Sequence, residues 1–178
     1  MKTIQIQIPE GKKAEWVNGV LTLTTEDVTD RIKTFDDALK ELGGDHPFVQ
    51  EYHRLTINGA PSADVRAYLK LRIVCAALNE GWKPQFTKDE ERWHPWHWLD
   101  TQKEIDGLDE EEKTNSCIIP MEHYQTEFAE LACSNSSFAA GGTNVDISSR
   151  LCLKSRELAA YCGMQFIHLW ADFKLIRK

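Results

Sequence analysis

Apolar residues recur at helical spacing through the last part of the chain, and this pattern limits the fold more than any other feature. They are separated by four, four, three, four and three positions, which places their side chains on one face of an α-helix. Ser155 stands before them as a typical N-cap residue. We therefore expect a helix over residues 155–175 that packs against a core. Its apolar face consists of Leu158, Cys162, Phe166, Leu169, Phe173 and Ile176.

A second long helix is expected over residues 62–80, where Ser62 caps the start and Gly81 ends the pattern. Its apolar residues cover two neighbouring faces, and a helix that is apolar over so wide an arc is buried. Two shorter amphipathic segments precede it, at 35–42 and 48–55. They predict a helical hairpin.

Period-two patterns predict strands elsewhere. Ile4, Ile6 and Ile8 alternate with polar residues, and residues 16–23 form a second candidate with a kink or turn at Asn18-Gly19. The segments 92–99 and 149–153 are also expected to be strands, with 117–121 and 128–133 as weaker candidates. The acidic stretch 104–112 is expected to be helix or loop. Residues 134–149, rich in small and polar types, are expected to form a loop.

These elements indicate an α+β protein with one domain over residues 1–178. We expect an N-terminal β element at 1–24, short helices at 25–60 and a core α+β unit at 61–178. In that unit a small, mostly antiparallel sheet containing 92–99 and 149–153 packs against the two longer helices. A chain of this length can bury such a core without metals or disulfides.

The net charge of −7 argues against general nucleic-acid binding, which needs a surplus of basic residues. Five cysteines, an odd number without a short pairing motif, indicate buried thiols in a reducing compartment. We find no signal peptide and no apolar stretch long enough to span a bilayer. These features predict a cytoplasmic protein without membrane contact.

The segment 92–99 concentrates tryptophan and histidine. In a strand, His94, Trp96 and Trp98 share one face. Trp93, His97 and Leu99 share the other. One face is expected to pack on the core, and the exposed one could stack a planar ligand such as a nucleobase; alternatively, the whole segment is core.

The same alternation separates His94 from His97, so they are expected to be structural rather than to chelate one ion. The spacings of Cys117, His123 and Cys133 match no zinc pattern. No acid/base pair, phosphate loop or nucleophile motif is present either. We therefore expect no cofactor and assign no catalytic residue.

Three basic residues, Arg150, Lys154 and Arg156, surround the start of the expected last helix. Free backbone N–H groups and the positive end of the helix dipole favour an anion there. This place is the best candidate for contact with a phosphate or carboxylate. The alternative is that these residues are ordinary surface charges beside a core strand.

Three blocks of sequence carry a resemblance: ALNEGWKP at 77–84, WHPW at 93–96 and SRLCLKSRELAAYCGMQF at 149–166. In this order they resemble a family of small proteins encoded by phages and prophages of gut Bacteroidetes. The opening MKTIQIQIPEG is similar to the start common in that family. The resemblance implies a genomic context in a bacterial host, and it implies no activity.

The first functional hypothesis is a non-enzymatic phage or prophage accessory protein that binds a host or virion protein, in the host cytoplasm or with the virion. The second is a protein that binds or sequesters a small molecule or nucleotide through the exposed aromatic face with Arg150, Lys154 and Arg156. A third is a metal-dependent hydrolase that uses the His and Cys positions.

Overall fold

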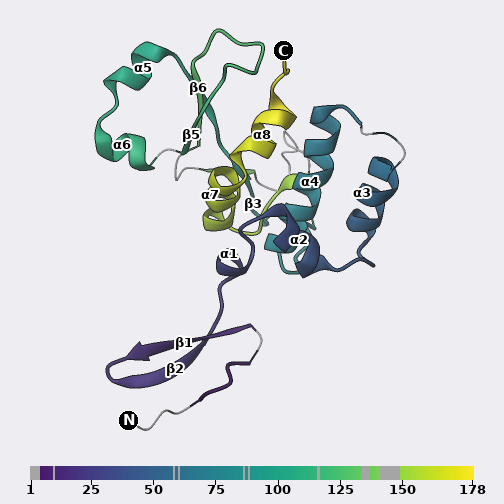
Figure 1. Cartoon of the computed structure of the whole chain (residues 1–178), viewed down its shortest axis with the longest axis vertical. Helices are drawn as coiled ribbons and strands as arrows, with labels where there is room; N and C mark the ends of the chain where they lie inside the picture. Colours follow the sequence, from purple (N-terminus) through teal and green to yellow (C-terminus); the bar gives the residue numbers. More distant parts are fainter. Residues whose placement is uncertain are drawn as a thin grey trace.

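The structure is a computed structural model, and it describes residues 5–9, 11–57, 59, 61–85, 87, 89–115, 117–133, 137–140 and 149–178. A β-hairpin near the N-terminus stands away from the rest of the molecule, which we call the body (Figure 1). It consists of the antiparallel strands β1 (Lys12–Val17) and β2 (Val20–Thr25). We call residues 12–25 the arm.

The turn of the arm lies at Asn18-Gly19, where φ is 50° and 81°. Two consecutive positive φ values are typical of a type I′ turn, whose twist matches that of paired strands. The expected kink or turn is therefore a turn, and the segment 16–23 forms parts of two strands. Residues 5–9 lie outside any strand, so the strand predicted from Ile6 and Ile8 is wrong there; Ile4 lies outside the described residues.

Helices follow the arm and build one side of the body. They are α1 (Val28–Arg31), α2 (Phe35–Leu42), α3 (Pro47–Ile57) and α4 (Ala63–Leu78). Thr34 and Asp37 form a capping box that fixes the start of α2. The predicted helical hairpin and the buried helix after Ser62 are confirmed.

Two small antiparallel sheets belong to the body. In the first, β3 (Arg92–Pro95) pairs with β7 (Ser137–Ala140). The second has the order β4-β6-β5, with β4 (Trp98–Asp100), β6 (Glu130–Cys133) and β5 (Cys117–Pro120). The helices α5 (Gln102–Gly107) and α6 (Glu110–Asn115) connect β4 to β5 at the end of the body far from the arm (Figure 1).

The chain ends with the 3-10 turn η1 (Ser149–Leu151) and the helices α7 (Arg156–Gln165) and α8 (Ile167–Lys174). The main core joins α2, α3, α4, η1, α7 and α8, with Leu71, Leu151 and Trp170 almost fully buried. A second core lies between the three-stranded sheet and α8, and it includes Leu131 and Ile167. The α+β class, with small antiparallel sheets against longer helices, is therefore confirmed.

The single strand expected over 92–99 is wrong, because the segment divides between two sheets. Trp96 and His97 belong to no strand, and they separate β3 from β4. Pro95 has no N–H to donate, so a continuous hydrogen-bonded ladder through this segment is not available.

The strand expected over 149–153 is also wrong. Residues 149–151 form η1, and Leu153 makes only an isolated bridge to Trp93. The buried Asn79 donates its Nδ2 to the carbonyl of Cys152 at 2.9 Å, and its Oδ1 accepts from the N–H of Lys154 at 3.0 Å. A side chain therefore satisfies backbone groups that a strand would pair.

The helix expected over 155–175 is interrupted at Phe166, where φ is −114° and ψ is 27°. Phe166 still faces the core, so the apolar spacing continues through the break and did not reveal it. The expected loop at 134–149 contains β7, and residues 134–136 and 141–148 lie outside the described residues.

No helix in the described part of the chain is long and apolar enough to cross a membrane.

Candidate functional site

The arm is an amphipathic hairpin. Successive cross-strand pairs point to alternate sides of a two-stranded sheet. One side, which we call the apolar face of the arm, carries Ala14, Trp16, Leu21 and Leu23. The opposite side carries Lys13, Glu15, Thr22 and Thr24, with Val17 and Val20 beside the turn.

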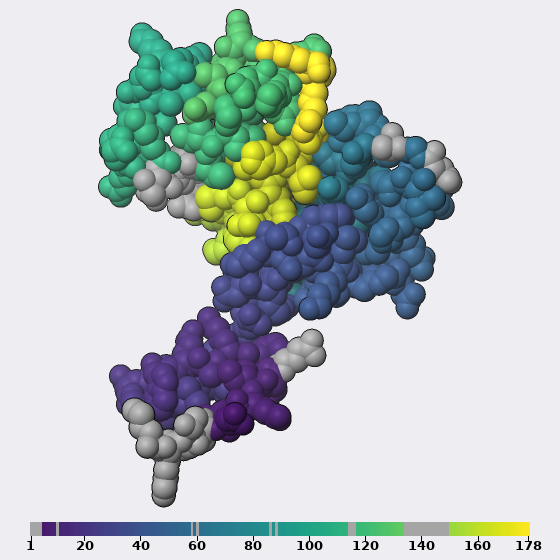
Figure 2. All heavy atoms as spheres, viewed as in Figure 1, coloured from purple at the N-terminus to yellow at the C-terminus, as the bar shows by residue number. Residues whose placement is uncertain are grey.

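The apolar face of the arm is open rather than packed on the body. Trp16 is 73% exposed and Leu23 is 47% exposed. Figure 2 shows the arm as a lobe of its own below the body. Such an exposed indole is typical of a binding surface, because burying it against another molecule removes apolar area from water.

The two outer edges of the arm differ in charge. Strand β1 contains the charged residues Lys12, Lys13 and Glu15, whereas β2 reads VLTLTT without a charge or a proline. Charges and prolines are the usual means by which proteins prevent a further strand from adding to an edge. The β2 edge therefore has no such protection.

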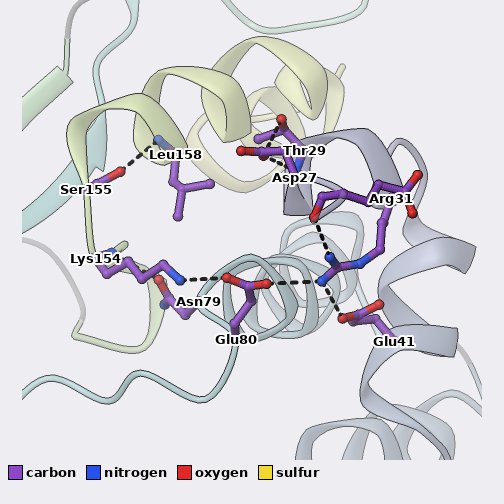
Figure 3. A network of polar contacts seen from close by, with 10 residues as sticks. Asp27, Thr29, Arg31, Glu41, Asn79, Glu80, Lys154, Ser155 and Leu158 are labelled. Atoms are coloured by element: carbon purple, nitrogen blue, oxygen red, sulfur yellow. Dashed lines mark hydrogen bonds and ion pairs between the residues drawn. The ribbon is translucent and has the colours of Figure 1, made fainter. Parts of the chain in front are cut away.

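A network of polar contacts fixes the base of the arm to the body (Figure 3). The Arg31 guanidinium donates to the carbonyl of Glu26 at 3.0 Å, directly after β2. It also contacts Glu41 on α2 at 2.9 Å and Glu80 after α4 at 3.1 Å. Asp27 caps α1 by accepting from the N–H of Thr29.

The second oxygen of Glu80 accepts from Lys154 at 2.8 Å (Figure 3). The hydrogen bond from Lys154, followed by that from Arg31, lowers the pKa of Glu80. Lys154 and Glu80 line a hollow of about 480 Å³ at the base of the arm. Glu26, Asp27 and Glu157 line it too, so carboxylates outnumber the lysine and disfavour an anion there.

The start of α7 contains the predicted cap, because Ser155 Oγ accepts from the N–H of Leu158 at 3.3 Å. The three basic residues around it do not converge. Arg150 lines a cavity beside α3 and α4, Lys154 lines the hollow at the arm, and Arg156 lines a separate depression with Tyr161.

The Trp/His segment is partly core and partly surface. His94 is 2% exposed on β3, whereas Trp96 and Trp98 are 45% and 40% exposed. The two indoles meet edge to face with ring centres 6.5 Å apart. The expected shared face of three residues is therefore not formed, because β3 and β4 belong to different sheets and Trp96 lies in neither strand.

Burial is the main cause of unusual pKa values in this segment. It lowers the pKa of His94 to about 4, aided by the nearby charge of Arg92. It lowers the pKa of His97 to about 3, aided by Lys174, whose Nζ lies 2.9 Å from His97 Nδ1. Both rings are therefore neutral at physiological pH.

Sequence reasoning did not single out the apolar face of the arm or the role of Asn79. The arm had a usable signal, because alternating apolar residues flank Asn18-Gly19 on both sides. The role of Asn79 had no usable sequence signal, since an asparagine after a helix is common and its hydrogen-bond partners lie more than seventy positions away.

Among the residues that the structure describes, no group of three His, Cys, Asp or Glu side chains could hold a metal ion. The fold and the site together define an α+β protein with a projecting, amphipathic hairpin. Comparison with protein-family models, with curated proteins and with solved structures finds no match.

Proposed function

We propose that this chain is a non-enzymatic accessory protein that acts by binding another protein, and that the arm is its binding element. The observation that carries the proposal is the 73% exposure of Trp16 on the apolar face of the arm. Tryptophan is among the residues that contribute most to protein interfaces.

The arm is expected to be more stable when a partner is bound to its apolar face than when it is free. A two-stranded hairpin alone is marginally stable in water, because it buries little apolar surface. Packing Trp16 and Leu23 against a partner removes that surface from water and stabilises the hairpin at the same time. The arm therefore gains more from binding than a rigid surface patch does.

The partner proposed is a different protein that supplies an extended strand to β2 and an apolar surface to Trp16. A strand adds to a free edge through main-chain hydrogen bonds, and side chains give specificity. β2 is the suitable edge because it carries no charge, whereas Lys12, Lys13 and Glu15 protect β1.

The resemblance of 77–84, 93–96 and 149–166 to proteins of phages and prophages of gut Bacteroidetes supports the biological setting. In that setting the partner is a host or virion protein, and the protein acts in the cytoplasm of the bacterial host or with the virion. The first of the three blocks contains Asn79 and Glu80, which hold the base of the arm and the start of α7.

The test uses a double variant of the apolar face, Trp16→Ser with Leu21→Ser. Full-length protein is expressed in its host, crosslinked at a photoreactive residue placed at Leu23, and isolated. We expect one host or phage protein to be crosslinked, and the purified partner to bind the wild type at least about tenfold more tightly than the double variant, because a buried tryptophan contributes about 2 kcal/mol or more.

The matched control is Glu15→Ser with Thr22→Ser, which changes a cross-strand pair on the opposite side of the same strands. It should retain the affinity of the wild type. Equal weakening by both double variants would contradict the proposal. So would a concentration-dependent dimer of the purified chain that Trp16→Ser removes, because that result would assign the apolar face to a second copy.

A further inference from the structure

A cavity of about 570 Å³ lies on the body, apart from the arm. It is formed where the end of α2, the start of α3, the end of α4, the loop 81–84 and η1 come together. Its volume is within the range of sites for small molecules. Most of its lining is apolar, and Phe48 and Trp82 contribute aromatic rings.

One aromatic side chain of the lining, Phe48, is held in place. The guanidinium of Arg72 lies 4.1 Å from the ring centre of Phe48 and forms an ion pair with Glu51. Phe48 also contacts His46 edge to face, with ring centres 5.1 Å apart. A fixed aromatic side chain can stack or contact a planar ligand without losing much conformational freedom on binding.

The charged residues of the lining are of one sign. Lys83 and Arg150 are cationic, and the lining contains no Asp or Glu. Glu80, close in sequence, is turned to Lys154 and Arg31 (Figure 3). The protein has a net charge of −7, but this cavity is lined by two cations and no carboxylate. The local positive charge favours binding of an anion.

The other polar groups of the lining fit this reading. Asn79 is committed to the backbone of Cys152 and Lys154. Burial raises the pKa of the Cys152 thiol to about 11, so the thiol is uncharged. His46 Nδ1 accepts from the N–H of Phe48 at 3.2 Å, and the proton of the neutral ring is therefore on Nε2, which is a donor.

We propose that this cavity binds a small aromatic anion, a molecule with a flat ring system and a phosphate or carboxylate group. The rings contact Phe48 and Trp82, and the anionic group pairs with Lys83 and Arg150. This site is independent of the arm and of the protein-binding role proposed for it.

The experiment is isothermal titration calorimetry of the full chain at pH 7 and low salt. The probes are AMP, GMP, indole-3-acetate, adenosine and inorganic phosphate. We expect at least one aromatic anion to bind at 1:1 stoichiometry with a dissociation constant below about 1 mM. Adenosine and phosphate should each bind about tenfold more weakly or not at all, since each lacks one half of the recognised chemistry.

The nature of the best probe identifies the source of the anion, because AMP and GMP carry a phosphate and indole-3-acetate a carboxylate. Lys83→Gln and Arg150→Gln should each weaken its binding by about tenfold, the effect expected for loss of one charge-assisted contact. The matched control is Arg156→Gln, which removes the same charge near the start of α7 but lines another depression. It should leave the affinity unchanged.

A second readout is the His46 imidazole signal in NMR. Burial and the charge of Lys83 lower its pKa in the free protein, and a bound anion should raise it again. The proposal is overturned if no aromatic anion binds the folded protein with a dissociation constant below about 1 mM. It is equally overturned if Arg156→Gln weakens binding as much as Arg150→Gln.

Discussion

His94 and His97 show how strongly the surroundings of one side chain can differ from those of its neighbours. Trp96 and Trp98 alternate with them along the chain and are exposed, whereas His94 is buried and His97 is half-buried. An imidazole held neutral by burial must take up a proton when the chain unfolds in acid. Stability at low pH is therefore tied to these two rings.

We predict that acid destabilises the protein in part through His94, whose contribution can be isolated by substitution. The pKa of His94 is about 4 in the folded state and about 6.5 in an unfolded chain, so the unfolded chain binds the extra proton between these values. The contribution of His94 is fully present above pH 6.5 and is lost as the pH falls to 4. It amounts to as much as about 3 kcal/mol.

Urea unfolding at a series of pH values measures this effect. His94→Gln should show a shallower loss of unfolding free energy between pH 6.5 and 4 than the wild type. His123→Gln, at an exposed position, serves as the control and should follow the wild type. Parallel curves for all three proteins would show that His94 is not the group responsible.

At the scale of the elements, α7 approaches β3 and β6 very closely, and Gly163 makes this possible. A methyl group at Gly163 would lie 2.5 Å from Cys133 Sγ on β6 and 2.8 Å from Pro95 Cβ on β3. Both distances are shorter than real contacts of this kind. The helix can therefore lie against the two strands only without a side chain at this position.

We predict that Gly163→Ala destabilises the protein by about 2 kcal/mol, the usual cost of overpacking a core. The sign is informative, because Gly to Ala inside a helix normally stabilises by up to about 1 kcal/mol. Gly107→Ala in α5 is the control, since a methyl group there meets no other atom within 4 Å. Thermal melts of both variants test the pair, and a stabilising Gly163→Ala would refute the close packing.

The sequence predicted elements whose signal is local. The apolar spacing within 35–42 and after Ser62 identified α2 and α4, because a helical period is visible within a few turns of sequence. The division at Trp96 and the η1 turn could not be predicted. They depend on partners distant in sequence, such as Leu153 for Trp93 and Asn79 for Cys152.

The candidate sites show the same difference between local sequence signals, which are predictable, and contacts between distant residues, which are not. Arg150 was predicted as an anion contact, yet its partners in the cavity, Lys83 and His46, lie more than sixty positions earlier and gave no sign of meeting it. The expected grouping of Arg150, Lys154 and Arg156 fails for a related reason. Lys154 forms an ion pair with Glu80, and the two residues meet only because α4 places Glu80 beside the start of α7.

At the scale of the whole molecule, the arm and the body depend little on each other. The main core begins at Val28 and the second at Leu99, and no described residue of the arm belongs to either. The side-chain contacts across the junction include exposed ion pairs, such as Lys13 with Asp30 at 3.5 Å. Exposed ion pairs of this kind contribute at most about 1 kcal/mol.

We therefore predict that removal of residues 1–25 leaves the body folded. Its melting temperature should change by less than about 4 °C, which corresponds to about 1 kcal/mol for a chain of this size. Differential scanning calorimetry measures the change. A loss of more than about 10 °C would show that the arm supports the body.

Removal of residues 175–178 provides the comparison at the other end. This short tail is tied to the body, because Gln125 donates its N–H to the carbonyl of Ile176 at 2.7 Å and Lys178 donates to that of His123 at 3.0 Å. Its loss should lower the melting temperature more than the loss of the whole arm does.

The arrangement of the main core also sets an order of events during synthesis. Val28 and Trp170 belong to one core, so the body cannot close until Trp170 has left the ribosome. The arm has only local contacts between β1 and β2, and hairpins of this kind form within microseconds. A nascent chain therefore presents its binding element to the cell well before it has a folded body.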